Sequence, residues 1–110
     1  MTVRLVGGDA SNRGRVEIFY HGVWGTICDD FWDLLDAKVV CRQLGFKGAL
    51  KALHSAVYGQ GTGVIWMDDV KCTGNETALS QCGHRGWRVT ECVHMEDASV
   101  VCIPPGENNK

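Results

Sequence analysis

The stretch ICDDFWD, residues 27–33, combines three features that decide how this chain folds. Cys28 ends an alternating apolar stretch, which predicts the end of a buried strand. Asp29 and Asp30 then place two acidic groups beside that cysteine, although acidic side chains are rarely buried unless they are paired. Asp33 stands at the position of a helix N-cap, because an amphipathic segment begins directly after it. The stretch therefore predicts a strand end, an acidic turn and a helix start.

The rest of the chain alternates short strand patterns with glycine-rich turns. The predicted strands are 3–6, 15–20, 23–28, 64–70 and 98–102. Apolar residues spaced three, four and seven positions apart predict one helix that begins at Asp33 and stops at Gly45. A second, short helix is predicted at 75–81, whereas residues 45–63 carry no clear pattern. Strands therefore dominate the prediction, with one well-defined helix packed against them.

Length and composition predict one globular domain. The 110 residues leave no room for a second core, and 45% of them are apolar. A net charge of −2 gives no attraction to nucleic acid, and no apolar run approaches the ~20 residues of a membrane span. Residues 1–2 precede the domain without the apolar region of a signal peptide, so we interpret them as an added start. We assign 3–103 to the domain and 104–110 to a C-terminal linker segment.

The cysteines predict an extracellular protein. The six are Cys28, Cys41, Cys72, Cys82, Cys92 and Cys102. They contain no C-x-x-C spacing, so zinc knuckles and thioredoxin-like sites are not indicated. An even number without metal spacing favours three disulfides, which persist in oxidising compartments. The sequon Asn75-Glu76-Thr77 agrees with that location, because N-glycosylation is extracytoplasmic and would modify Asn75. Cysteine counting alone leaves many pairings open.

A series of short motifs then points to a family. In order, they are GRVE (14–17), WGTICDD (24–30), VCRQLGF (40–46), GQGTG (59–63), WMDDVKC (66–72) and HMEDA (94–98). With them the chain resembles the scavenger receptor cysteine-rich domain from about Val3 to Cys102, and its six cysteines resemble group A of that family. The resemblance implies an α+β fold, a small disulfide-stapled domain in which a curved antiparallel β-sheet cradles one α-helix. It implies the disulfides Cys28–Cys92, Cys41–Cys102 and Cys72–Cys82.

The resemblance also implies a cation site at the first disulfide. A Cys28–Cys92 bond brings Asp29 and Asp30 close to the segment that holds Glu96. Three carboxylates gathered without a cation raise one another's pKa values. Ca²⁺ or Mg²⁺ removes that cost, because both ions prefer oxygen ligands. We therefore predict a site for Ca²⁺, with Mg²⁺ as the alternative ion, at Asp29, Asp30 and Glu96.

A second cation site is predicted nearby. Some relatives hold a second ion between an acid of the D-D-V stretch and a polar residue just before the penultimate cysteine. Asp68, Asp69 and Glu91 stand at those places in this chain. The alternative interpretation is that Glu91 is balanced by Arg88.

The acids of the first site also have purely structural interpretations. Asp29 could cap a turn, and Glu96 could pair with an arginine such as Arg4 or Arg15. Asp97 follows directly in the same motif, and we expect it to be a buried residue that bonds the backbone rather than a ligand.

A basic surface is the other candidate for ligand binding. Its members are Arg13, Arg15, Arg85 and Arg88. They occur as small scattered pairs, so the alternative is that they are solvated charges at the rim of the domain. Trp87 lies in the same Gly/Arg-rich loop as the second pair, and of the four tryptophans it is the one expected at the surface.

Two functions remain, and neither is enzymatic, because no activating motif such as G-x-S-x-G or H-E-x-x-H frames the histidines and serines. The first is an extracellular ligand-binding module of a scavenger-receptor-like or adhesion protein. It would bind polyanionic, microbial-surface, lipoprotein or protein ligands with Ca²⁺ assistance, without inserting into a membrane. The second is an accessory or spacer domain of a larger secreted protease, oxidase or matrix glycoprotein, whose partners are other domains of the same polypeptide.

Overall fold

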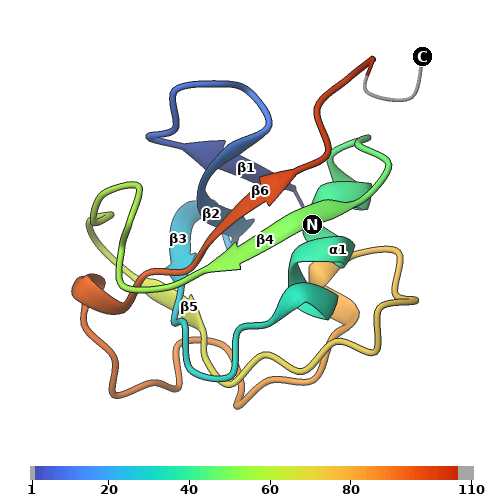
Figure 1. Cartoon of the computed structure of the whole chain (residues 1–110). Coiled ribbons are helices and arrows are strands. Elements are labelled where there is room, and N and C mark those ends of the chain that lie inside the picture. The colour runs from blue at the N-terminus through green and yellow to red at the C-terminus, as the bar shows by residue number, and fades with distance from the viewer. Residues whose placement is uncertain (1, 107–110) are drawn as a thin grey trace.

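The computed structural model describes residues 2–106 and shows six strands, one α-helix and two 3₁₀ turns in that range (Figure 1). Met1 and residues 107–110 lie outside the described residues, so part of the predicted start and most of the predicted linker do too. The elements are β1 (Val3–Val6), β2 (Arg13–Tyr20), β3 (Val23–Ile27), α1 (Leu34–Gln43), β4 (Ala49–Leu53), β5 (Ile65–Met67), η1 (Leu79–Gln81), η2 (His94–Glu96) and β6 (Ser99–Cys102).

The strands form one strongly curled sheet, as predicted. Its order is β4-β6-β2-β3-β5, and β1 pairs with the other edge of β2. The long strand β2 pairs with β6 through residues 13–15 and with β3 through residues 17–20, which lets the sheet fold around the core. One feature differs from the predicted antiparallel sheet. β3 and β5 run parallel, since the chain between them crosses over through α1 and β4.

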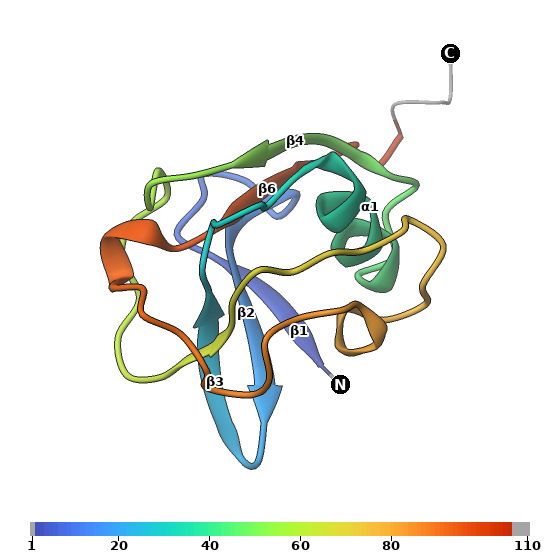
Figure 2. The ribbon, with the colours of Figure 1, turned by 90° about the horizontal axis from the view of Figure 1, so that it is seen from below.

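The helix α1 begins and ends where the sequence predicts. The Asp33 carboxylate accepts a hydrogen bond from the Asp36 amide at 3.1 Å, and the Asp36 carboxylate accepts one from the Asp33 amide at 2.9 Å. This reciprocal capping box satisfies donors that a helix start otherwise leaves free. At the other end Gly45 adopts a φ of +96°, a conformation that favours glycine. The buried face of α1 packs against β4 and β6 (Figure 2).

Three disulfides hold these elements together, and all three pairings implied by the family resemblance are confirmed. Cys28–Cys92 joins the end of β3 to the segment before η2. Cys41–Cys102 joins α1 to β6, and Cys72–Cys82 closes the short loop that contains Asn75.

Four local features differ from what the sequence predicts. The unassigned segment contains a strand, β4, and the predicted strand 64–70 is only three residues long. The predicted helix 75–81 is a single 3₁₀ turn, because the Glu76 carboxylate accepts amide hydrogen bonds from Thr73 and Gly74 and so holds the chain in a turn before it. Trp87 is half-buried rather than exposed, since it stacks on Tyr20 with ring centroids 3.8 Å apart.

Candidate acidic site at the Cys28–Cys92 disulfide

Backbone hydrogen bonds draw three segments together at the end of β3. The Cys28 amide donates to the Met67 carbonyl at 2.9 Å, which fixes β3 beside the end of β5. The next amide, that of Asp29, donates to the Glu96 carbonyl at 2.8 Å and so fixes the turn beside η2. The disulfide then links Cys28 to Cys92. Acids from three distant parts of the sequence are therefore gathered around one sulfur bridge.

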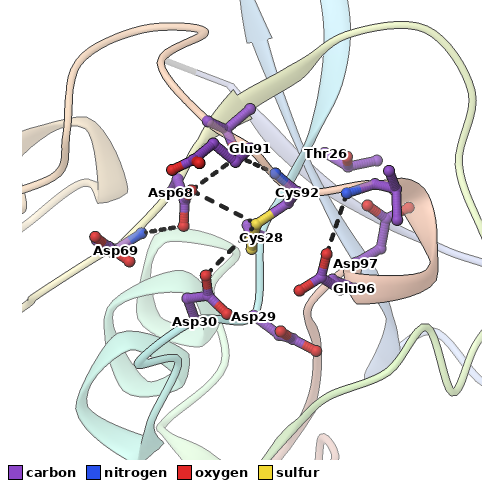
Figure 3. The surroundings of a disulfide bond; sticks show 12 residues. Thr26, Cys28, Asp29, Asp30, Asp68, Asp69, Glu91, Cys92, Glu96 and Asp97 are labelled. Carbon is purple, nitrogen blue, oxygen red and sulfur yellow. Dashed lines mark hydrogen bonds between the residues drawn. A yellow bond between two sulfur atoms is a disulfide. The ribbon is translucent and has the colours of Figure 1, made fainter.

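Asp30 is the centre of this acidic cluster, which we define as Asp30, Asp68, Asp69 and Glu96 (Figure 3). Carboxylate oxygens of Asp30, Asp68 and Asp69 lie within 4.8 Å of one another. One oxygen of Asp30, one oxygen of Glu96 and the two disulfide sulfurs also lie within 4.8 Å of one another. In Figure 3, Asp68 and Asp69 lie on one side of the disulfide and Glu96 on the other, with Asp30 between them.

The electrostatics of Asp30 are unfavourable for a carboxylate. Desolvation raises its pKa, and the charges of Asp68, Glu96, Asp29 and Asp69 raise it further. Within residues 2–106, neither Asp30 nor Asp69 has a side chain that accepts a hydrogen bond from an N–H or O–H group. The Cys92 sulfur lies 3.7 Å from Asp30 Oδ2, but a disulfide sulfur carries no hydrogen to donate. The negative charge of Asp30 is thus left without a compensating donor.

Asp29 does not belong to the cluster. Its Oδ2 accepts a hydrogen bond from the Ser55 amide at 2.7 Å, so its side chain caps the turn after β4. Figure 3 shows its carboxylate pointing away from Asp30. The structural interpretation of Asp29 therefore holds, and its role as a cation ligand stays a prediction.

Glu91 also lies outside the cluster. Its carboxylate is 90% exposed and approaches Arg85, not Arg88, at 3.5 Å. Asp68, in contrast, is buried, and its Oδ2 accepts a hydrogen bond from the Thr90 hydroxyl at 2.8 Å. The structure thus pairs Asp68 and Asp69 with Asp30, where the sequence had paired them with Glu91.

The two acids of the HMEDA motif behave differently. Glu96 forms no pair with Arg4 or Arg15, because both arginines bind the buried Glu17, at 2.7 and 3.0 Å. Glu96 instead accepts a hydrogen bond from the Val93 amide at 3.2 Å, and its other oxygen accepts none from the described residues. Asp97 is fully buried and accepts a hydrogen bond from the Gly61 amide at 2.7 Å, which confirms its structural role.

The arginines of the predicted basic surface are mostly engaged. Arg13 lies 3.6 Å from Asp9, and Arg15 is only 11% exposed against Glu17. Arg85 pairs with Asp68 and Glu91. Arg88 is therefore the member of the set that forms no ion pair within residues 2–106.

Comparison with known proteins identifies the family of this fold. A sequence model of the scavenger receptor cysteine-rich (SRCR) domain matches residues 6–103. The chain belongs to the SRCR family. The crystal structure of the third SRCR domain of murine neurotrypsin is 50% identical in sequence, with a TM-score of 0.84 over 92% of this chain and 94% of that one. The dimeric form of the SRCR domain of mouse MARCO is also 50% identical, with a TM-score of 0.79 over the same shares.

Longer proteins contain similar SRCR domains. The galectin-3-binding protein of Rattus norvegicus is 55% identical over 100 residues, which are 91% of this chain and 17% of that protein. Lysyl oxidase homolog 4 of Bos taurus is 54% identical over 105 residues, which are 94% of this chain and 14% of that protein. The chain thus spans less than a fifth of these relatives. An isolated SRCR domain is a non-catalytic module, and one such domain lies within the protein named lysyl oxidase homolog 4.

Some features of this SRCR domain gave no signal in its sequence. Ser55, whose amide binds Asp29, lies in the segment without a pattern, and it adopts a φ of +60° that nothing in the residue type suggests. His94 lies 3.0 Å from Asp97 and 2.9 Å from the Gly63 carbonyl, so it connects η2 to the glycine-rich segment before β5.

No helix within residues 2–106 is long and apolar enough to cross a membrane.

Proposed function

We propose that this SRCR domain is an extracellular ligand-binding module that holds a divalent cation at the acidic cluster. The ion is Ca²⁺, or Mg²⁺ in its place, and it bridges the protein to an anionic group of a ligand. Polyanions, microbial surfaces, lipoproteins and acidic patches of proteins all offer such groups. Three disulfides and an exposed sequon support an extracellular location.

The position of Asp30 is the observation that carries this proposal. Asp30 stands within 4.8 Å of the Asp68–Asp69 pair and of Glu96, and its pKa is raised by desolvation and by the charges of the neighbouring acids. A bound cation would remove that repulsion. The donors available are carboxylate oxygens, which suit Ca²⁺ and Mg²⁺, and the disulfide sulfurs are not available as thiolate ligands.

The exposure of Asp30 supports a bridging role for the ion. Asp30 is exposed, whereas Asp68 is buried, so an ion held between them would be open to solvent on one side. Ca²⁺ takes about 6–8 oxygen ligands, and water supplies those that the protein does not. Sulfate, phosphate or carboxylate oxygens of a ligand can replace such waters. The residues of this chain would thus hold the ion, and the ion would recruit the ligand.

A second candidate function is that of an accessory domain within a larger secreted protein. The similarity to lysyl oxidase homolog 4, and to an SRCR domain described as the third in neurotrypsin, supports it. In that case the partner is another domain of the same polypeptide, and the acidic cluster has no ligand-binding role.

Chelation separates the two functions. Binding of the oxidised domain to an immobilised sulfated polysaccharide is measured by surface plasmon resonance in 2-fold steps of Ca²⁺, and again in excess EDTA. We expect binding that saturates with Ca²⁺ and falls at least about tenfold in EDTA, since the ion contributes the ligand contact. Binding that is equal in both buffers would contradict the cation mechanism, and binding that is absent in both would support the accessory function instead.

A further inference from the structure

A small hollow beside the acidic cluster is lined mainly by basic side chains. Its volume is about 230 Å³, and its lining residues are Asp69, Lys71, Gly83, His84 and Arg85. The Lys71 amide donates to the Gly83 carbonyl at 2.8 Å, so the two walls of the hollow are joined by backbone. Lys71, His84 and Arg85 thus offer three potential donors to an anion. The hollow adjoins the acidic cluster, because Asp69 belongs to both.

Lys71 is the freest of these donors. It forms no ion pair within residues 2–106, and its ammonium lies 5.3 Å from the centre of the Phe31 ring. Phe31 directly follows Asp30 and adopts a φ of +62°. The contact with the ring places the ammonium beside the residue that follows Asp30 in the sequence. Lys71 is exposed, so its charge is available to a ligand in solution.

His84 and Arg85 add directional hydrogen bonds. The Nδ1 of His84 accepts a hydrogen bond from the Gly86 amide at 3.1 Å, and burial lowers the pKa of the ring. A neutral ring that accepts at Nδ1 carries its proton at Nε2, where it can donate. Arg85 uses Nη1 toward Asp68 at 3.4 Å and toward Glu91 at 3.5 Å, which leaves its remaining N–H groups for another acceptor.

The nearby acids decide when an anion can bind here. Asp30, Asp68 and Asp69 together outweigh the charges of Lys71 and Arg85, so they oppose an anion as long as the cluster is free of cations. A divalent ion at the cluster reverses this local field. Cation and anion should therefore bind cooperatively, and each should raise the affinity of the other by the same factor.

We propose that the hollow formed by Lys71, His84 and Arg85 is an anion subsite for a sulfate or phosphate monoester, filled together with a cation at the acidic cluster. The inference rests on the proposed function, since it assigns the ligand a second contact beside the ion. It also narrows the ligand class. A sulfated or phosphorylated sugar offers tetrahedral oxyanions to both places, whereas an isolated carboxylate can occupy only one of them.

The experiment uses sucrose octasulfate as the probe, titrated by calorimetry into the oxidised domain with and without saturating Ca²⁺. Lys71→Gln is the test variant, and Lys47→Gln is the matched control, because Lys47 is equally an exposed lysine and does not line the hollow. With Ca²⁺ present, Lys71→Gln should weaken binding about tenfold, while the control stays within about twofold of the parent. Inositol hexaphosphate, titrated in parallel, shows whether sulfate or phosphate esters bind more tightly.

The outcomes separate this inference from the proposed function. Equal weakening by Lys71→Gln and Lys47→Gln would overturn the subsite, because it would show only a loss of net charge. If Ca²⁺ itself gives no binding heat, the cation proposal fails, and the subsite is then judged from the titrations without Ca²⁺. A loss specific to Lys71→Gln in those titrations would retain the anion contact and overturn its coupling to a cation, and no specific loss would overturn both. Amide shifts of Lys71, His84 and Arg85 in NMR titrations should report the same result independently.

Discussion

Asp29 and Asp30 are adjacent in the sequence yet have different surroundings in the structure. Asp29 binds the Ser55 amide, while Asp30 faces Asp68, Asp69 and Glu96. The sequence predicted that acids gather at this disulfide, but not which acid points into the cluster. That choice depends on the backbone of the turn, where Phe31 adopts a left-handed φ of +62°. Such a conformation is uncommon for an aromatic residue, so no pattern of residue types predicts it.

Gly25 shows at the residue scale how tightly β3 packs on β5. It is buried, and a Cβ added there would meet the ring of Trp66 and lie 2.7 Å from Cγ1 of Val64. We expect Gly25→Ala to lower the free energy of unfolding by about 2 kcal/mol, because neither neighbour can move without disturbing the core. The measurement is equilibrium denaturation in urea.

Gly83→Ala is the matched control for that substitution. A Cβ at Gly83 would find its nearest atom, the Lys71 carbonyl oxygen, at an ordinary 3.7 Å. The control should therefore unfold within about 0.5 kcal/mol of the parent. Equal losses in the two variants would show that the contact between Gly25 and Trp66 is looser than described.

At the scale of elements, α1 depends on a buried carboxylate. Asp36 is fully buried and accepts hydrogen bonds from the Asp33 amide at 2.9 Å and from the Cys72 amide at 2.8 Å. It thus closes the capping box and attaches the helix to the loop of the Cys72–Cys82 disulfide. Desolvation raises its pKa from 3.8 to about 6, although both amide hydrogen bonds act in the opposite direction.

This shift predicts how stability depends on pH. Between pH 3.8 and about 6 the folded protein keeps a proton that the unfolded chain has lost. The contribution of Asp36 to the free energy of unfolding is therefore largest below that window, falls as the pH rises through it, and changes by about 3 kcal/mol in total. We expect Asp36→Asn to remove this fall, measured as the difference in unfolding free energy between pH 4 and pH 6.

The control for that measurement is Asp9→Asn, whose carboxylate is 83% exposed. It should show the same difference between the two pH values as the parent does. The same difference in Asp36→Asn would mean that this buried carboxyl titrates normally.

The elements themselves were predictable to different degrees. Alternation and capping located β1, β3 and α1 to within a residue or two, because those signals are local. The strand β4 was missed because it lies in a glycine-punctuated segment and owes its extended form to pairing with β6. The parallel pair β3–β5 was missed for a related reason, since strand direction depends on the path of the intervening chain. The features that local sequence patterns did not predict are therefore those that long-range strand pairing determines.

At the scale of the whole molecule, the disulfide pairing came from the family resemblance rather than from the spacing of the cysteines. The structure confirms it and shows why it matters for the site. Cys28 and Cys92 are 64 residues apart, and their bond holds Asp30 near Glu96. The sequence shows that Asp30 follows Cys28 and that Asp68 stands in the WMDDVKC motif. It does not show that the two acids meet, because that contact depends on the parallel pairing of β3 with β5.

The sequon gives a prediction about the secreted molecule. Asn75 is exposed in the loop closed by Cys72 and Cys82, where it lines a hollow together with Arg42, Glu76 and Thr77. We expect the domain secreted from a eukaryotic cell to carry an N-glycan there, because the side chain is accessible in the folded state. Mass spectrometry should show a heavier protein that peptide N-glycosidase F returns to the mass of the chain with one asparagine deamidated. The Asn75→Gln variant serves as the unglycosylated control. A secreted parent without added mass, like that variant, would contradict glycosylation at Asn75.

The proposed cation site depends above all on Asp30. The most direct test is calorimetric titration of Ca²⁺ into the oxidised, chelator-stripped domain, beside Asp30→Asn and the exposed-acid control Asp9→Asn. We predict saturable binding by the parent and by the control, and none by Asp30→Asn. Asp29→Ala, titrated in the same series, decides whether Asp29 also contributes a ligand. No binding heat in the parent with its three disulfides intact, or equal binding by Asp30→Asn, would contradict a cation site at Asp30.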